Sequence, residues 1–485
     1  MINIHNEKEP APGKEFGKSE LYTIAVGTVI GAGVITLIVP GIKYTGYSVW
    51  LAYFVAILLG MTMIAPYFFV SSTLRCGGGL YSLLNNLGGP RFGGIYAFVS
   101  LTQMFGTALF GTSAAAYIGD IFPILGTPTA KICVGAGLLT FFYLVNLRGL
   151  NIMAKIQKVM VYFLIAALLM FAVFGLIHAK NPIFTMSDPD WLTHGWGITF
   201  SEEGKIDGGF FGAALLFLFS TNGYYALIGY GRNAKNAKRD IPKMLLLTTL
   251  TLIVCYCGPA MAAAACMTLE EYGDSTTLVF AARKIFPPVL YVVFIIGGPI
   301  MALLSTLNTS FANYGINMGQ QCSDGWLPPV LGKKNKYGVA YIALTIQWVA
   351  VTLPVIFQFS ITTLTNLVQL AASFYAFLNF FGFMKMPKLY PHAWKESSLH
   401  VPNGVYYGFC CASLIVAVIS VWKTLLSMPT WLAVANVVMI GGFSLLSVIR
   451  SKTGTINIRT SVWSGNAEDD ARVEEINREL ARKCS

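Results

Sequence analysis

Long apolar runs without Lys, Arg, Asp or Glu constrain this chain more than any other feature. A helix needs about 20 mainly apolar residues to cross the hydrocarbon core of a bilayer. Twelve such runs follow one another, at residues 21–40, 47–70, 92–118, 132–147, 159–178, 208–231, 244–267, 288–318, 339–358, 361–384, 404–422 and 429–449. The sequence therefore predicts an all-α integral membrane protein whose twelve transmembrane helices contact the lipid bilayer.

The composition excludes other broad classes of protein. Charged residues make up 11% of the 485 residues and apolar residues 55%, against about 25% charged in an ordinary soluble domain. A water-soluble enzyme would need more charge on its surface. The net charge of +11 does not indicate a nucleic-acid partner, because the basic residues lie in short loops between apolar runs and form no stripe.

The distribution of Lys and Arg predicts the orientation. The polar arm at 1–20 has no small-residue cleavage site, so we expect the mature protein to keep it. Basic residues concentrate in this arm, in the loops after even-numbered runs and in the tail; the others are Lys43, Lys131, Lys180, Lys205, Arg283, Lys284 and Lys423. By the positive-inside rule, we expect a multi-pass protein of the cell membrane with both termini in the cytoplasm.

The side chains of Asp, Glu, His, Lys and Arg are confined to arms, loops and run ends, and none lies in the middle of a predicted span. Intramembrane ionisable groups are the usual proton relays, and catalysis would need an acid and base, an activated nucleophile or a metal cluster. The nine Cys residues have neither metal-binding nor disulfide-framework spacing. We therefore expect no enzyme activity, no cofactor and no metal.

Two runs are interrupted at membrane depth. The first reads Gly-Thr-Val-Ile-Gly-Ala-Gly-Val-Ile over 27–35, and the sixth reads Phe-Ser-Thr-Asn-Gly-Tyr-Tyr over 219–225. Such residues can simply pack helices closely or bond across them. Alternatively, both helices are discontinuous and their unwound backbone lines a cavity. Runs one and six are equivalent if the first ten runs form two repeats of five, and paired interruptions of this kind point to a transporter binding site.

This interpretation predicts both the domains and the ligand. The domains are an arm (1–20), a first five-helix repeat (21–178), a second repeat (208–384), a helix pair (404–449) and a cytoplasmic tail (451–485). Amides at a half-helix N-terminus bind a carboxylate, and free carbonyls accept from an ammonium group or a cation. A zwitterionic amino acid presents both charges, and an amine can use the same carbonyls.

Short motifs in a fixed order over residues 20–345 resemble a known family. Besides 27–35, they are Gly78–Tyr81, Leu87–Pro90, Asn146–Gly149 with Lys155–Gln157, Lys235–Pro242, Ser305–Asn308 and Asp324–Pro328. The chain resembles the amino acid-polyamine-organocation transporters. The resemblance implies inverted five-helix repeats (the LeuT-like fold) with discontinuous first and sixth helices.

The resemblance also implies functional residues. In the family, the first-helix glycine motif contacts the substrate carboxylate and the broken sixth helix contacts the ammonium group. The substrate-binding set expected here is Thr28, Ile30, Gly31, Ala32, Gly33, Thr107, Phe219, Ser220, Thr221, Gly223 and Tyr225, with Phe219 where the family often has an aromatic gate. A possible cation site combines Gly27, Ile30, Ser305, Thr306 and Thr309, although hydroxyls commonly bond to their own helix instead.

Two departures from the family pattern bear on mechanism. Proton-linked members of the family carry a Lys in the fifth helix, where Leu164 stands here, which puts simple proton symport in doubt. The acidic pair that many members carry after the sixth helix is Arg232 and Asn233 here, and the following Pro is Ala237. These changes put the usual cytoplasmic gating contacts in doubt.

A site without fixed charge favours a neutral amino acid, because a charged substrate side chain would lack a partner. We expect a secondary transporter that alternates access by rocking a four-helix bundle against the rest, as an exchanger or a weakly ion-coupled carrier. The alternatives are an amino acid/amine antiporter partnered with a decarboxylase, and a receptor or subunit that binds without flux. The tail is expected to be an amphipathic helix or solvated, with a plug over the inner mouth as the alternative. The oligomeric state stays open.

Overall fold

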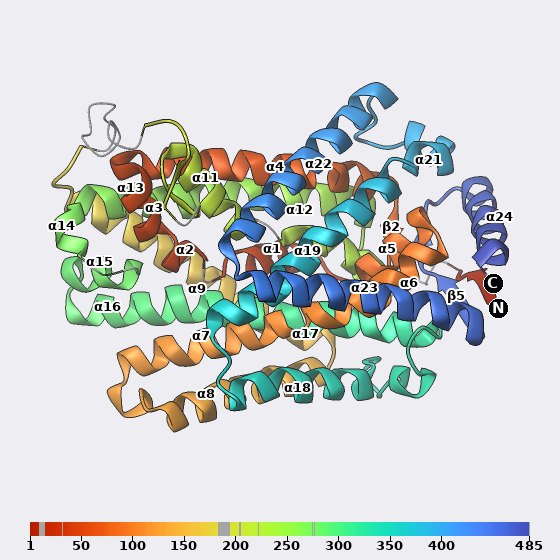
Figure 1. Cartoon of the computed structure of the whole chain (residues 1–485), viewed down its shortest axis with the longest axis horizontal. Coiled ribbons are helices and arrows are strands. Elements are labelled where there is room, and N and C mark those ends of the chain that lie inside the picture. Colours follow the sequence, from red (N-terminus) through yellow and green to blue (C-terminus); the bar gives the residue numbers. More distant parts are fainter. Residues whose placement is uncertain are drawn as a thin grey trace.

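Helices dominate the computed structural model, which describes residues 1–8, 15–31, 33–182, 195–202, 205–221, 223–273, 275 and 277–484. Most of the helices run along the long axis of the molecule (Figure 1). Nine helices in the described part are long and apolar enough to cross a membrane. The chain is therefore a multi-pass membrane protein, as its apolar runs predict.

Seven predicted runs coincide with uninterrupted helices. These are α4 (Val49–Thr73), α8 (Pro128–Leu147), α9 (Leu150–Ile177), α18 (Tyr341–Ile356), α19 (Ile361–Phe383), α22 (Asn403–Ser427) and α23 (Thr430–Thr453). Of these, α18 is shorter than the others and is an apolar helix below the length of a full span.

The other five runs are each divided into consecutive pieces. The first gives α1 (Lys18–Val29), α2 (Gly33–Thr36) and α3 (Ile38–Thr45), the third gives α6 (Pro90–Gln103) and α7 (Phe105–Ile121), and the sixth gives α11 (Phe210–Leu218), η3 (Phe219–Thr221) and η4 (Tyr224–Asn233). The seventh gives α12 (Ala237–Leu252), η5 (Ile253–Cys257) and α13 (Gly258–Cys266), and the eighth gives α16 (Pro288–Ile295), η6 (Ile296–Ile300) and α17 (Met301–Ser323).

Proline accounts for the two π-helical turns, η5 and η6. Pro259 lies two residues after the end of η5, and Pro299 lies within η6. A proline removes one backbone N–H and clashes with the preceding turn, so the helix widens locally instead of continuing its regular hydrogen bonds. The π turn η5 contains Tyr256, whose hydroxyl reaches the two helix breaks described below.

Short elements connect the long ones. They are η1 (Gly46–Ser48), α5 (Gly79–Gly88), η2 (Pro123–Leu125), the strand pair β3 (Thr199–Phe200) and β4 (Ile206–Gly208), α14 (Leu269–Tyr272), α15 (Leu278–Ile285), η7 (Pro329–Gly332), α20 (Met386–Leu389) and α21 (Pro391–Lys395). The helix α5 packs against α6, α17 and α19, and two residues separate its N-terminus from the strand β2 (Arg75–Cys76).

The two ends of the chain meet at one end of the molecule (Figure 1). The strand β1 (Ile2–Asn6) pairs in parallel with β5 (Ile456–Thr460), and β6 (Val462–Trp463) pairs antiparallel with β2. The final helix α24 (Ala467–Cys484) packs on β1. We call β1, β5, β6 and α24 the terminal cap. The predicted amphipathic tail helix is present, whereas the strands before it had not been predicted.

Candidate functional site

The first predicted interruption is a real helix break. Helix α1 ends at Val29, and Ile30 leaves the helical conformation with a ψ of 93°. The chain becomes helical again at Gly33, and Ala32 lies outside the described residues. The carbonyl groups at the end of α1 therefore lose their next helical partners, as helix termini do.

The sixth run is also broken, at the predicted position. Helix α11 ends at Leu218 and tightens into η3 before the chain restarts as η4. Gly223 has a φ of 120°, a conformation that side chains with a Cβ rarely adopt. A Cβ at this position would also lie 3.0 Å from the carbonyl oxygen of Thr28. Glycine is therefore required both by the turn and by the neighbouring first break.

The two breaks lie against each other. A Cβ added at Gly33 would lie only 2.4 Å from Cβ of Ser220, and Gly223 approaches Thr28 as described. The structure thus brings together Thr28, Gly33, Ser220 and Gly223, which are far apart in the sequence. Gly60 of α4 packs on Thr221, where an added Cβ would lie 2.4 Å from the Thr221 hydroxyl oxygen.

Two buried tyrosines connect these segments. The hydroxyl group of Tyr256 is 3.2 Å from the carbonyl oxygen of Val29 and 3.0 Å from that of Ser220, and it donates toward both. The hydroxyl groups of Tyr53 and Ser220 are 2.7 Å apart. Because Val29 is the last residue of α1 and Ser220 lies in the η3 turn, Tyr256 bonds one carbonyl group at each break.

The hydroxyl-rich segment of α17 meets the first break at one residue. The Thr306 hydroxyl lies 3.4 Å from the carbonyl oxygen of Ile30, and a Cβ at Gly31 would lie 3.1 Å from the same hydroxyl oxygen. The hydroxyls of Ser305 and Thr309 donate to carbonyl groups of their own helix, and the Thr306 hydroxyl also donates to one, that of Ala302 at 3.0 Å. Within the predicted cation set, Ile30 and Thr306 are therefore in contact.

Gly27, also in the predicted cation set, contacts α9 and not the hydroxyl-rich segment of α17. A Cβ at Gly27 would overlap the amide of Gln157 on α9. The Gln157 carbonyl accepts a hydrogen bond from Asn308, 2.9 Å away, and Asn146 donates to Asn308. This buried chain of amides was not predicted as part of the site. All three are amides within or next to otherwise apolar runs, which was the available signal.

Three predicted substrate residues lie away from the contact between the breaks. Tyr225 stacks on Tyr67 with ring centroids 4.9 Å apart. The side chain of Phe219 is 41% exposed, as a residue at the edge of a path or at the lipid surface would be. Thr107 is fully buried on α7, and its hydroxyl has no hydrogen-bond partner within the described structure.

A cavity of about 520 Å³ lies toward the predicted cytoplasmic end. Its lining includes Asn146, Arg148, Arg232, Gln320 and Lys334. None of the predicted substrate or cation residues lines it, although Phe311 and Ala312 of the lining lie on α17, shortly after Thr309.

Comparison with known proteins identifies the class. A family model described as amino acid permease matches residues 16–445, so the chain belongs to the amino acid permease family and is a membrane transport protein by class.

Several curated relatives are similar to it. The serine/threonine exchanger SteT of Bacillus subtilis is 25% identical over 287 residues, covering 56% of this chain and 60% of SteT. The branched-chain amino acid permease BcaP of Lactococcus lactis is 23% identical over 368 residues, covering 70% and 75%. An uncharacterized protein of Methanocaldococcus jannaschii is 22% identical over 331 residues, covering 66% and 71%.

Proposed function

We propose that this permease is a secondary transporter of neutral amino acids that alternates access across the cell membrane as an exchanger or a weakly ion-coupled carrier. The observation that carries the proposal is the contact between the two helix breaks, at Gly33 with Ser220 and at Gly223 with Thr28. The site contains backbone groups and hydroxyls and no ionised side chain among these residues. A substrate without a charged side chain suits such a site.

The substrate is held by the main chain. Its carboxylate binds amides that follow the first break, near Gly31, Ala32 and Gly33. Its ammonium group binds carbonyl groups of Ile30 and of the η3 turn. The Phe219 ring covers the bound substrate. Tyr256 bonds the carbonyl groups of Val29 and Ser220 and keeps them at a fixed separation. The site is therefore preorganised, and its groups need little rearrangement when the substrate binds. Thr28, Thr107, Thr221, Gly223 and Tyr225 shape the surrounding space.

The proposed architecture has twelve spans, with inverted repeats at 21–178 and 208–384, an additional helix pair at 404–449, and an arm and tail in the cytoplasm. The cavity beside Arg232 and Gln320 is the inner path to the site. On the other side, α3 packs tightly on α11, since a Cβ at Gly41 would overlap the ring of Phe217. A cavity toward the cytoplasm and close packing opposite support an inward-facing state.

The proposed mode of coupling is exchange. No carboxylate, imidazole, Lys or Arg side chain lies among the described residues of the two breaks, and such intramembrane groups are the common carriers of coupled protons. The similarity to SteT, an exchanger by name, and to the branched-chain permease BcaP supports exchange and neutral substrates. Should a cation be coupled, Ile30 and Thr306 are the first residues of the predicted set to test.

Counterflow in proteoliposomes tests this proposal. Labelled neutral amino acids are added outside vesicles that hold excess unlabelled amino acid, with and without sodium or proton gradients. We expect accumulation that needs only internal substrate. Ser220→Trp is expected to abolish it, because Ser220 lies in contact with Gly33 and Tyr53. Val418→Trp is the matched control, since Val418 is exposed on α22.

Each other outcome has a distinct meaning. Strict dependence on an ion gradient would contradict exchange. Flux driven only by an amine on the opposite side would favour the amino acid/amine antiporter that works beside a decarboxylase. Substrate binding by the folded protein without any flux would favour a receptor or a subunit that needs a partner chain.

A further inference from the structure

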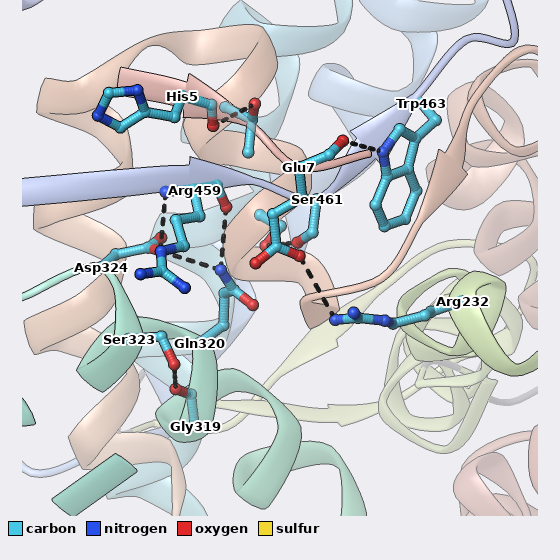
Figure 2. A network of polar contacts seen from close by, with 12 residues as sticks. His5, Glu7, Arg232, Gly319, Gln320, Ser323, Asp324, Arg459, Ser461 and Trp463 are labelled. Carbon is cyan, nitrogen blue, oxygen red and sulfur yellow. Dashed lines mark hydrogen bonds and ion pairs between the residues drawn. The ribbon is translucent and has the colours of Figure 1, made fainter. Parts of the chain in front are cut away.

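The terminal cap is attached firmly to α17. Asp324, which follows α17 directly, is buried and accepts hydrogen bonds from the Tyr81 hydroxyl at 2.8 Å, the Gln320 amide at 2.9 Å and the backbone N–H of Arg459 at 3.1 Å. Gln320 also donates to the carbonyl of Arg459, 3.0 Å away. Figure 2 shows Gln320 and Asp324 side by side beneath the strand that carries Arg459. The strand β5 therefore lies on the inner end of α17.

The same cap is attached to the other side of the inner mouth. Glu7, which follows β1, forms an ion pair with Arg232 at the end of η4, with a nitrogen to oxygen distance of 3.6 Å. The Trp463 indole donates to the carbonyl of Glu7, 2.7 Å away, so β6 and the N-terminal segment meet here (Figure 2). Beyond this, β6 pairs with β2, which follows α4.

These attachments border the inner cavity. Arg232 and Gln320, which contact the cap from opposite sides, both line the cavity, as does Gly77 directly after β2. A Cβ at Gly77 would lie 3.0 Å from the Trp463 ring. The cap therefore connects two walls of the cavity, one formed by α17 and the other by the ends of α4 and η4.

The two attachments differ in strength. Leaving a buried hydrogen-bonding group such as the Asp324 carboxyl without one of its donors costs about 1–3 kcal/mol. The Glu7 and Arg232 side chains are 27% and 37% exposed, and a pair so exposed contributes about 0–1 kcal/mol. The pairing of β6 with β2 covers only two residues on each strand, and the bonds beside it, from Gly77 N–H to the Ser461 carbonyl and between the Ser82 and Ser461 hydroxyls, are between neutral groups. If one attachment opens, it is the one to α4 and η4.

We propose that the terminal cap restrains the inner mouth: each transport cycle requires β6 and Glu7 to separate from β2 and Arg232, while β5 stays on Asp324. This inference rests on the proposed function in assuming a transport cycle in which a four-helix bundle rocks against the rest. We assign the ends of α4 and η4 to that bundle and α17 to the rest. The cap joins the two parts across the mouth.

A disulfide across β2 and β6 tests the proposal with a single substitution. Cys76 and Val462 are cross-strand partners and both are buried. Directly opposed Cα atoms of antiparallel strands lie about 4.5–5.5 Å apart, within the range that a disulfide spans. Val462→Cys can therefore be oxidised onto the native Cys76, and Cys76→Ala combined with Val462→Cys is the matched variant that cannot form the bond.

Counterflow is measured on the full chain before oxidation, after oxidation and after reduction, with the disulfide verified by mass spectrometry. We expect oxidation to slow exchange by about tenfold or more, since a conformational step would become limiting, and reduction to restore it. The Cys76→Ala variant should not respond to the oxidant. A cross-linked protein that exchanges as fast as its reduced form would overturn the proposal.

Hydrogen exchange separates this proposal from the proposed function. We expect the cross-link to slow amide exchange in the cavity-lining segment 145–151 and in 75–88, whatever substrate is carried. If the wild-type and reduced proteins move no amino acid, the proposed function fails. Slower amide hydrogen exchange in the cross-linked protein would then still support the restraint by the terminal cap. Unchanged amide hydrogen exchange in both segments would overturn the restraint. Trp463→Ala, which removes the bond to Glu7, should raise exchange in 75–88.

Discussion

The helix breaks and the terminal cap each join parts of the chain that are far apart in sequence, but with opposite chemistry. At the breaks, Thr28 and Gly33 meet Ser220 and Gly223 through backbone atoms and small side chains. At the cap, Glu7, Arg232 and Asp324 supply carboxylates and a guanidinium group. An ionised group is very costly in the hydrocarbon region and inexpensive near water. The contact between the breaks is accordingly made by backbone and small side chains, whereas the cap uses one ion pair, Glu7 with Arg232, and the hydrogen-bonded carboxyl group of Asp324.

The largest effect is expected from filling the space between the breaks. Gly33→Ala would place a Cβ 2.4 Å from that of Ser220, so the breaks must separate. We expect counterflow to fall by about a hundredfold, because misplacing a binding group by about 1 Å costs about that much. Gly442→Ala, where an added Cβ meets nothing within 4 Å, is the control. Normal flux in Gly33→Ala would show that the close contact is not needed.

The next effect concerns the tyrosine that bonds both breaks. Tyr256→Phe keeps the ring and removes the hydroxyl that serves Val29 and Ser220. Leaving buried carbonyl groups without a donor costs about 1–3 kcal/mol, so we expect the KM for counterflow to rise by about tenfold. Tyr224→Phe removes a buried hydroxyl bonded to Thr249 instead and should leave KM unchanged. Equal effects in both variants would mean that Tyr256 is merely structural.

At the cap, the expected effect depends on pH. Burial raises the pKa of Asp324 to about 7, and the nearby Glu7 acts in the same direction, against the hydrogen bonds from Arg459, Tyr81 and Gln320. Released into water, the carboxyl returns to its ordinary pKa near 3.8. The docked cap therefore binds the proton more tightly, so docking is strongest below pH 3.8, weakens as pH rises toward about 7 and is constant above.

Hydrogen exchange in residues 456–463, corrected for the intrinsic pH dependence of amide exchange, measures this docking. With these two pKa values we expect protection to fall by roughly a hundredfold between pH 5 and pH 8. Asp324→Asn, which cannot ionise, should remove the dependence. Protection that increases with pH in the unmodified protein would contradict the assignment.

The smallest effect is expected from the exposed ion pair. Glu7→Gln removes the charge that faces Arg232 while keeping the carbonyl that accepts from Trp463. Since exposed pairs contribute about 0–1 kcal/mol and are screened by salt, we expect the counterflow rate to change by about twofold at most. The difference should shrink further at high salt. A loss as large as that of Gly33→Ala would place the cap, and not the breaks, at the centre of transport.

The sequence predicted the breaks because membrane depth leaves few reasons for three glycines in 27–35 or for a polar cluster in 219–225. It could not predict that Gly223 packs on Thr28, since that contact depends on how the two helices meet. Ser305 and Thr309 were predicted as cation ligands from their positions in the family pattern. In the structure their hydroxyls donate hydrogen bonds to carbonyl groups of their own helix. Whether these residues bind a cation or a substrate stays a prediction.

The strands of the cap had a sequence signal that was not used. Residues 2–6 read Ile-Asn-Ile-His-Asn and residues 456–460 read Ile-Asn-Ile-Arg-Thr, with apolar and polar residues alternating as in a half-buried strand. The two segments pair in register, Ile2 with Ile456 and Ile4 with Ile458. Their partnership was not evident because strand pairing between distant segments is set by the fold and not by local preference.

The parallel pairing of β1 and β5 also limits the order in which parts of the chain can fold. Asn6 and Thr460, which are hydrogen-bonded at the end of this pair, are separated by 454 residues along the chain. At a synthesis rate of about 5–20 residues per second, β1 waits on the order of 20–90 s for its partner to be made. During that time the apolar residues Ile2 and Ile4 have no strand to pair with. The cap is therefore among the last parts of the fold to form, after the spans that it joins.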